Sequence, residues 1–396
     1  MDNKKSFGIG LAAGIILTII IVFSVNAYQQ RSAWGELLDP NSKVTEIYEL
    51  LSDISMFPID KEVMLDSMYR GFLEGVGDPY TQYFDRQALQ AFRERVAGEY
   101  VGVGVLVLED VETMTLIVAQ AFRGSPAAAA GLLPGDKIVG VDGVDVTGRP
   151  TAETMSMIRG PEGSAVNLAI YRPYEDERFN VSIVRTVITI PSVYHEMMSS
   201  HIGYIRIEGF DDATMEQFSE AMLELTAQNM QGLILDVRNN PGGGLHVVTY
   251  IANYFTPEGV VAYTIDAAGR RQNFNSDDTY LGLPLVVLIN GRSASASELL
   301  SGAIQDTEMG ILIGEQTFGK GIVQHLRPLS DGSAVKVTVA KYFTPSGTSI
   351  HGVGVAPDIE IEMDEALSRR IGDLSLEEDV QLQRALQVVQ EIERVN

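Results

Sequence analysis

The chain has 396 residues, 45% of them hydrophobic, so it is long enough for two or three domains with real cores. It has no cysteine, which excludes disulfides, thiol catalysis and cysteine-ligated metal. Its formal net charge of −24 would repel the phosphates of a nucleic acid, so we expect no nucleic-acid partner.

The N-terminus carries an uncharged apolar stretch from Phe7 to Ala27. A helix needs about 20 apolar residues to cross a bilayer, so we predict a transmembrane signal anchor over residues 1–30. The preceding Lys4 and Lys5 should stay in the cytoplasm, which places the rest of the chain outside the cell membrane. A cleaved signal peptide is the alternative, because Val25–Ala27 has small residues suited to cleavage; the product would be secreted or periplasmic.

Residues 31–96 show a helical pattern, with apolar residues at three- and four-residue steps, and a turn signal at residues 75–85. We therefore predict an N-terminal helical segment here. Helices outside a catalytic core often join two copies of a chain, so a homodimer is one expectation.

Apolar and polar residues alternate in short runs over residues 97–188, which predicts a small β-rich domain. Within it, "YVGVGV" (100–105) predicts a tight glycine turn beside an exposed strand. Successive backbone N–H groups at such a turn can hold a C-terminal carboxylate while the peptide extends the sheet. An ordinary glycine-containing hairpin explains the same residues.

Residues 189–396 alternate strands with helices. Strands such as "GLILDVR", "LPLVVLIN" and "GILIGE" are continuously apolar. Strands of this kind are buried on both faces, so the segment predicts an α/β core with a largely parallel sheet.

Three serines alternate with alanine in "GRSASASELLSGAIQD" (291–306), between a buried strand and a helix expected to begin near Ala296. A serine at this junction would lie beside free backbone N–H groups and the positive end of the helix dipole. Both would stabilise a tetrahedral oxyanion. Serine is also a preferred N-cap residue, which explains one of the three without any catalysis.

Two further loops could complete such a site. "RNNPGGGL" (238–245) lets the backbone approach a ligand closely, as an oxyanion hole, an anion cradle or a simple turn. In "EQTFGKGIVQ" (315–324), Lys320 could act as a general base if burial lowered its pKa from ~10.4 to roughly 7–8. Gln324 could orient the amine or the serine; an exposed loop lysine is the plain alternative.

The five histidines lie in no Gly-x-Ser-x-Gly context and form no His-Glu-x-x-His motif. We expect each to be structural or at the surface. We also expect no metal site and no cofactor.

Taken together, these motifs resemble those of the C-terminal processing peptidases, also called tail-specific proteases. The resemblance covers nearly everything after residue 60. It rests on "GVGDPYTQYF", "GEYVGVGV", "GSPAAAAGLLPGDKIVGVDG", "IRGPEGS", "LILDVRNNPGGGL", "SASASELLSGAIQD", "TFGKGIVQ" and "KYFTPSGTSIHGVGVAPD". It implies a crotonase/Clp-like α/β protease core over residues 189–396, with an inserted PDZ domain over residues 97–188.

The resemblance also implies roles for individual residues. Ser295 matches the family nucleophile, Lys320 its base and Gln324 the supporting residue. The backbone N–H groups of Ala296 and of one glycine in 242–244 would form the oxyanion hole, and we favour Gly243. In the PDZ domain, substrate C-termini would bind at Tyr100, Val101, Gly102, Val103 and Gly104. Arg159 in "IRGPEG" is a candidate contact between the PDZ domain and the protease core, and an ordinary surface charge explains it equally well.

The expected protein is thus a single-pass protein of the bacterial cell membrane with its catalytic domain outside the cytoplasm. It would bind protein substrates by their C-termini, hydrolyse them through an acyl-enzyme on a serine–lysine dyad, and could be controlled by an adaptor. The alternative is a catalytically silent PDZ adaptor on a protease fold. A trypsin-like PDZ protease would need a Ser-His-Asp triad and a mostly β core, and the α/β pattern disfavours both. A crotonase-like acyl-CoA enzyme would share the fold, but a fold does not settle function.

Overall fold

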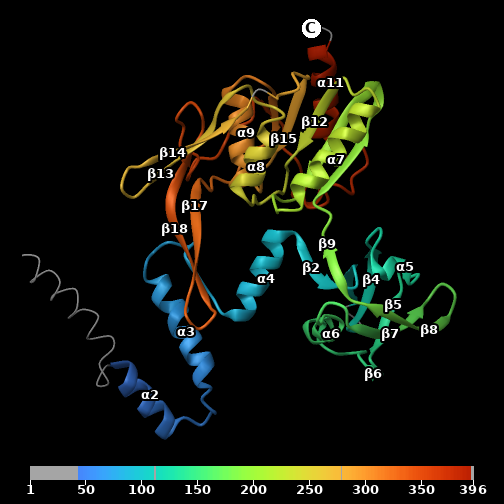
Figure 1. Ribbon diagram of the computed structural model, residues 1–396, viewed down its shortest axis with the longest axis vertical. Helices are drawn as coiled ribbons and strands as arrows, with labels where there is room; N and C mark the ends of the chain where they lie inside the picture. Colours follow the sequence, from blue (N-terminus) through green and yellow to red (C-terminus); the bar gives the residue numbers. More distant parts are fainter. Residues whose placement is uncertain (1–42, 111–112, 278, 394–396) are drawn as a thin grey trace, which may run out of the picture. The chain divides into compact units, whose positions relative to one another are not determined.

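The structure, a computed structural model, describes residues 43–110, 113–277 and 279–393 (Figure 1). The chain divides into two compact units, one up to Gly75 and one from Val76 onward. The predicted anchor over residues 1–30 lies outside the described residues. Within the described ranges, no helix is both long and apolar enough to cross a membrane.

The first unit contains the two helices that the sequence predicts, α2 (Lys43–Ile54) and α3 (Lys61–Glu74). Helix α3 begins where the side chain of Asp60 accepts hydrogen bonds from the N–H groups of Glu62 and Val63. Neither helix has a buried residue, and α2 exposes an apolar stripe that includes Ile47 and Leu50.

The predicted β-rich domain is an antiparallel sheet in the strand order β3-β4-β5-β7-β8, with β6 paired to β5. Strands β2 and β9 pair with each other where the chain enters and leaves this sheet, which explains how the domain can be inserted into a larger fold. The elements are β2 (Glu99–Gly102), β3 (Val105–Asp110), β4 (Thr115–Ala121), α5 (Pro126–Ala129), β5 (Lys137–Val141), β6 (Val144–Asp145), α6 (Thr151–Ile158), β7 (Ala165–Arg172), β8 (Glu177–Val184) and β9 (Thr186–Thr189).

The α/β core is built on a second sheet in the order β10-β11-β12-β15-β16-β19. All its pairs are parallel except β10–β11, so the predicted largely parallel sheet is confirmed. Its elements are β10 (Val193–Met197), η1 (Ser199–His201), β11 (Ile202–Ile207), α7 (Thr214–Ala227), β12 (Gly232–Asp236), α8 (Leu245–Ala252), β15 (Leu285–Ile289), α9 (Ala296–Asp306), β16 (Ile311–Gly314), β19 (Ile359–Glu360), α10 (Glu365–Ser368) and α11 (Val380–Glu393).

Both faces of this sheet are covered, which is why its strands are continuously apolar. Leu233 and Leu235 of β12 pack in one core with side chains of α7, α8 and α9. Ile234, between them, faces the other way and packs with Leu386 and Val389 of α11. Successive residues of a strand point to opposite faces, so each central strand must be apolar throughout.

A third, antiparallel sheet joins segments that are far apart in the chain. It runs in the order β1-β18-β13-β14, with β17 also paired to β18. Its elements are β1 (Gln82–Phe84), β13 (Gly259–Asp266), β14 (Arg271–Ser276), β17 (Ile322–Pro328) and β18 (Ala334–Phe343), and helix α4 (Arg86–Ala97) follows β1. The prediction of a turn over residues 75–85 is wrong for β1. A strand of three residues is too short to show a periodic pattern of apolar side chains, and its pairing with β18, such as Gln82 with Lys336, decides its conformation.

A buried ion-pair network fixes the chain just after β12. The guanidinium of Arg238 donates to both Asp236 and Asp379, with Nη2–oxygen distances of 2.6 and 2.8 Å. All three side chains are buried, and Asp379 directly precedes α11. Because buried charges are tolerated only when they are paired, this network ties the C-terminal helix to the loop that follows β12.

Candidate active site

Two loops at the carboxyl ends of β12 and β15 meet at the predicted serine. This end of an open parallel sheet is where α/β proteins bind ligands. The loop after β15 ends at Ser295, the N-cap of α9, with φ 56° and ψ −110°. Residues other than glycine rarely adopt this backbone conformation, because it costs of the order of 1–3 kcal/mol. Backbone strain of this kind concentrates at functional sites.

The structure distinguishes the three serines of the motif. The hydroxyls of Ser293 and Ser297 are buried and donate to the carbonyl oxygens of Val237 and Asn240, at 2.8 and 2.9 Å. Ser295, between them, is only half-buried, and none of the described residues accepts a hydrogen bond from its hydroxyl. The outer two serines therefore hold the two loops together, and the middle one remains available for chemistry.

A buried carboxylate connects the serine loop to the lysine loop. Oε2 of Glu298 accepts hydrogen bonds from the backbone N–H groups of Ser295 and Lys320, at 2.7 and 2.8 Å. Oε1 accepts from the N–H of Gly319 and the hydroxyl of Thr317, both at 2.6 Å. Glu298 was not among the predicted site residues, although its spacing from Ser295 is that of a capping box.

Lys320 is half-buried in this arrangement. Burial lowers the pKa of its amine below the ordinary value, and the negative charge of Glu298 only partly opposes that shift. The direction is the one a general base requires, since only the neutral amine can accept a proton.

Gln324 lies on β17 and donates from Nε2 to the backbone carbonyl of Tyr80. The ring of Tyr80 also faces Lys320, with 5.1 Å between Nζ and the ring centroid. Tyr80 was not among the predicted site residues, because nothing in its local sequence indicates a partner about 240 residues away.

The glycine loop packs directly against the serine. A Cβ on Gly242 would lie 2.6 Å from the carbonyl oxygen of Ala294 and 2.9 Å from the nitrogen of Ala296, so only glycine fits. The N–H of Gly242 is already used, because it donates to Oδ1 of Asn240 at 2.8 Å. In the described part of the chain, the N–H groups of Gly243 and Ala296 have no such acceptor.

The predicted peptide-binding residues lie around the start of β3. Tyr100, Val101 and Gly102 belong to β2, and Val103 and Gly104 form the link to β3. Strand β3 is an edge of its sheet, and it exposes 49% of Leu106 and 61% of Leu108. An unpaired edge of this kind can accept a further strand.

The ring of Tyr100 packs against the backbone of Gly102, two residues later in the chain. A Cβ on Gly102 would be only 2.4 Å from Cε2 of the Tyr100 ring. Burial raises the pKa of the Tyr100 hydroxyl, and the charge of Arg159 and the N–H groups of Val105 and Gly104 partly oppose that shift.

Arg159, the C-cap residue of α6, lies near the N-terminal side of the β domain rather than on the protease core. Its guanidinium carbon is 5.6 Å from the centroid of the Tyr100 ring, and Nη1 is 3.4 Å from Oε2 of Glu94 in α4. Among the described contacts of Arg159, none reaches residues 189–396.

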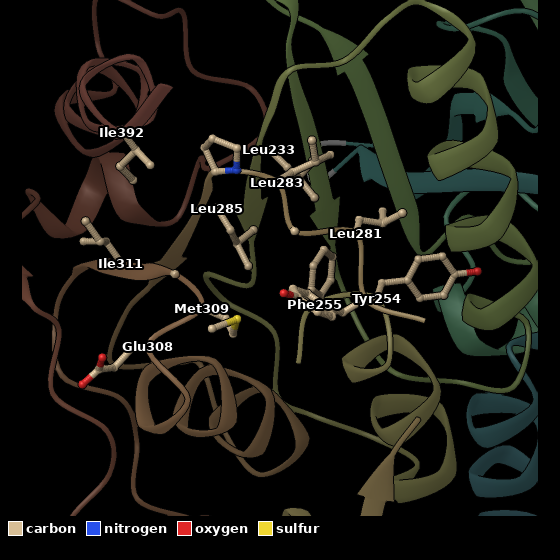
Figure 2. A pocket seen from close by; sticks show the side chains of 14 residues that line it. Leu233, Tyr254, Phe255, Leu281, Leu283, Leu285, Glu308, Met309, Ile311 and Ile392 are labelled. Atoms are coloured by element: carbon tan, nitrogen blue, oxygen red, sulfur yellow. The ribbon is translucent and has the colours of Figure 1, made fainter. Parts of the chain in front are cut away.

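Two cavities lie near the core. One of about 600 Å³ borders Tyr80, Ile322 and His351, next to the lysine loop. The other, of about 420 Å³, is surrounded by apolar side chains such as Leu285, Met309 and Phe255 (Figure 2). Leu285 begins β15 whereas Ser295 follows its end, so the second cavity lies at the amino ends of the strands and is not part of this site.

The histidines have other contacts. His195 and His246 pair with Glu224 and Asp212, at 3.0 and 2.8 Å. In the hydrogen-bond network of the described residues, no histidine reaches Ser295. Within the same residues, no cluster of three or more histidine, aspartate or glutamate side chains could hold a metal ion.

Comparison with known proteins gives a consistent result. The family model of peptidase family S41 matches residues 201–361, and a PDZ domain model matches residues 117–172. The chain is 33% identical to the carboxy-terminal processing protease CtpB of Bacillus subtilis over 86% of its own length and 71% of that protein. It is 35% identical to a carboxyl-terminal-processing protease of Synechocystis over 80% of its length and 75% of that protein.

A solved structure from Bacteroides fragilis, described as a candidate S41 protease, shares the fold. It has a TM-score of 0.51 and 17% identity, and the match covers 86% of this chain and 93% of that one.

Proposed function

We propose a catalytic mechanism for this chain, which belongs to peptidase family S41, the carboxy-terminal processing proteases, and contains a PDZ domain. The neutral amine of Lys320 takes the proton from the hydroxyl of Ser295 as its oxygen attacks the substrate carbonyl carbon. The resulting oxyanion accepts hydrogen bonds from the N–H groups of Ala296 and Gly243. Gln324, anchored on the carbonyl of Tyr80, holds the position of the lysine side chain.

The tetrahedral intermediate then collapses. The lysine ammonium returns its proton to the leaving amine, the C–N bond breaks, and an ester forms between Ser295 and the substrate. A water molecule, deprotonated by the neutral Lys320, attacks this ester and releases the new carboxylate and the free serine hydroxyl. No histidine takes part in either half-reaction.

The observation that carries this proposal is the buried Glu298. Its Oε2 accepts from the backbone N–H groups of both Ser295 and Lys320, so the backbones of the serine and lysine loops are held at a single atom. Burial lowers the pKa of the lysine despite the nearby negative charge.

The test uses the full chain and a protein substrate with a free C-terminus. Ser295→Ala and Lys320→Ala should each reduce cleavage by at least about 10³-fold with unchanged circular dichroism. A fluorophosphonate probe should label the wild type at Ser295 and fail to label Ser295→Ala. Turnover near the wild-type rate in either variant would exclude the dyad.

The PDZ domain would select substrates by their C-termini. The edge strand β3 would pair with the incoming peptide, and the turn at Gly102, Val103 and Gly104 would hold the terminal carboxylate. A substrate with an amidated C-terminus should therefore bind and be cleaved much less well than its free-acid counterpart. Equal rates for both forms would show that the carboxylate is not read.

We place the catalytic unit outside the cytoplasm, on a single-pass membrane anchor formed by residues 1–30, because the apolar stretch and the preceding lysines have the composition of an anchor. Membrane fractionation of the full chain and of a chain lacking residues 1–27 distinguishes this from a cleaved signal peptide. An anchored protein stays with the membrane, and a processed one is released.

The proposal also includes a homodimer through the exposed faces of α2 and α3, and control of the enzyme by an adaptor.

A further inference from the structure

We propose that Tyr80 is a positioning residue for the lysine base: its ring shields one side of the Lys320 amine from water, and its carbonyl anchors Gln324. This inference rests on the serine–lysine mechanism proposed above. It gives residues 78–81, which lie outside the predicted protease core, a direct part in setting the pH range of the enzyme.

The backbone around Tyr80 is firmly held. Oδ1 of Asp78 accepts from the N–H of Tyr80 at 3.0 Å, and Oδ2 accepts from the hydroxyl of Thr81 at 2.6 Å. The hydroxyl of Thr81 in turn accepts from the N–H of Thr338 in β18, at 3.4 Å. Burial raises the pKa of Asp78, but hydrogen bonds from Thr81, Thr338 and Tyr80 outweigh it and leave the pKa below its usual value.

Strand β1 continues this attachment, because Gln82 pairs with Lys336 of β18. Because residues 78–82 are attached to β18 in this way, the position of Tyr80 is fixed relative to that strand. Tyr80 can therefore position Lys320 and Gln324 even though it is about 240 residues away in the chain.

Two contacts lead from Tyr80 to the proposed catalytic groups. The Nζ atom of Lys320 lies 5.1 Å from the centroid of the Tyr80 ring, and Nε2 of Gln324 donates to the Tyr80 carbonyl oxygen. The ring of His351 meets the Tyr80 ring edge-on, with centroids 6.5 Å apart. Tyr80 and His351 also border the cavity of about 600 Å³, and Lys320 is not among the residues that line it.

The ring acts on the amine in two opposite ways. Its π-electrons attract a cation and favour the charged amine. Its bulk keeps water away and favours the neutral amine. Burial is the largest cause of the pKa shift at Lys320, and the net shift is downward. We therefore expect that removing the bulk of the ring changes this pKa more than removing its π-electrons does.

Other charged groups also face this region. Glu298 of α9 raises the pKa of Lys320, and Lys336 of β18 has its own pKa lowered by burial and by the charge of Lys320. Asp78 and His351 lie beside the Tyr80 ring and interact with each other. All four remain in every variant below, and the backbone carbonyl contact to Gln324 does too, so the comparison isolates the ring.

The experiment is the pH dependence of kcat/KM for the full chain carrying Tyr80→Phe, Tyr80→Leu or Tyr80→Ala. The acidic limb is the part of the profile in which activity rises with pH as the Lys320 amine loses its proton. Phenylalanine keeps the ring, so this limb should coincide with that of the wild type. Leucine keeps the apolar bulk without the ring electrons, so the limb should stay in place or move to lower pH. Alanine admits water, so the limb should move up by about one unit, which lowers activity about tenfold on the acidic side of the limb and leaves it unchanged on the plateau.

Phe84→Ala is the matched control. Phe84 belongs to the same segment and also faces a lysine, with 5.4 Å between its centroid and Nζ of Lys336, and among the ring contacts of the described residues it has none with Lys320. This variant should keep the acidic limb of the wild type. A Tyr80→Ala profile that is lowered uniformly at every pH, with an unmoved limb, would overturn the inference and leave Tyr80 a purely structural role.

The parent mechanism is tested separately by Lys320→Ala. If that variant retains turnover, the dyad itself is wrong. If it is inactive while Tyr80→Ala has the wild-type limb, the dyad stands and only the role of Tyr80 is refuted.

Discussion

Replacing Glu298 by glutamine should separate the geometric role of this carboxylate from its electrostatic one. The side chain is fully buried and accepts four hydrogen bonds, from Ser295, Lys320, Gly319 and Thr317. Glutamine keeps one oxygen but turns an N–H₂ donor toward groups that are themselves donors. At least two of the four donors therefore lose their acceptor.

The structure gives the size of this effect. A hydrogen bond to a charged group contributes about 1.5–3 kcal/mol, and a buried donor without a partner costs about 1–3 kcal/mol. Loss of two such bonds predicts a free energy of unfolding lower by about 3–6 kcal/mol. The total for a domain is only about 5–15 kcal/mol, so Glu298→Ala, which removes all four acceptors, should fold poorly.

The catalytic consequence has a defined sign. The charge of Glu298 raises the pKa of Lys320, so its removal lowers that pKa further and leaves more of the amine neutral at pH 7. Protonation alone would then increase activity. We nevertheless expect kcat to fall by about 10²-fold or more, because the serine and lysine loops lose their common anchor.

The assay combines urea denaturation followed by circular dichroism with a pH profile of cleavage. We expect the acidic limb of Glu298→Gln to move to lower pH while the maximum rate falls. Glu362→Gln, at an exposed glutamate, serves as the control and should match the wild type in both measurements. A Glu298→Gln enzyme with wild-type kcat would refute the argument that this carboxylate positions the dyad.

Three further predictions follow from the same geometry. Gly242→Ala should abolish cleavage, because its Cβ would lie 2.6 Å from the carbonyl oxygen of Ala294 at a φ of 98°; turnover above about a tenth of the wild-type rate would contradict this. Arg238→Met should lower the free energy of unfolding by about 3–5 kcal/mol, because it leaves Asp236 and Asp379 buried without their partner; denaturant titration measures this. Lys320→Met should raise stability at neutral pH, since a lysine whose folded pKa is lowered binds fewer protons folded than unfolded and therefore destabilises the fold below that pKa. Thermal unfolding from pH 6 to 10 should show the difference shrinking as pH rises, and a less stable Met variant at pH 7 would contradict it.

Much of the fold could be predicted because its signals are local. The apolar strands β12, β15 and β16 are continuous because both of their faces are buried, and that pattern indicated a largely parallel sheet. The start of α9 at Ala296 followed from the serine motif and the apolar spacing after it. By contrast, β1 is three residues long, and its pairing with β18 could not be inferred from neighbouring residues.

The candidate site divides in the same way. The sequence by itself determined which chemical groups are available: serines at a helix start, a lysine between glycines, a glycine-rich loop and no cysteine. Only the tertiary structure decided which serine hydroxyl is left unused, that the backbones of both loops bind Glu298, and that the Tyr80 ring lies 5.1 Å from the Lys320 amine. The physical reason is that burial, and with it the pKa of an amine, depends on residues brought together from distant parts of the chain.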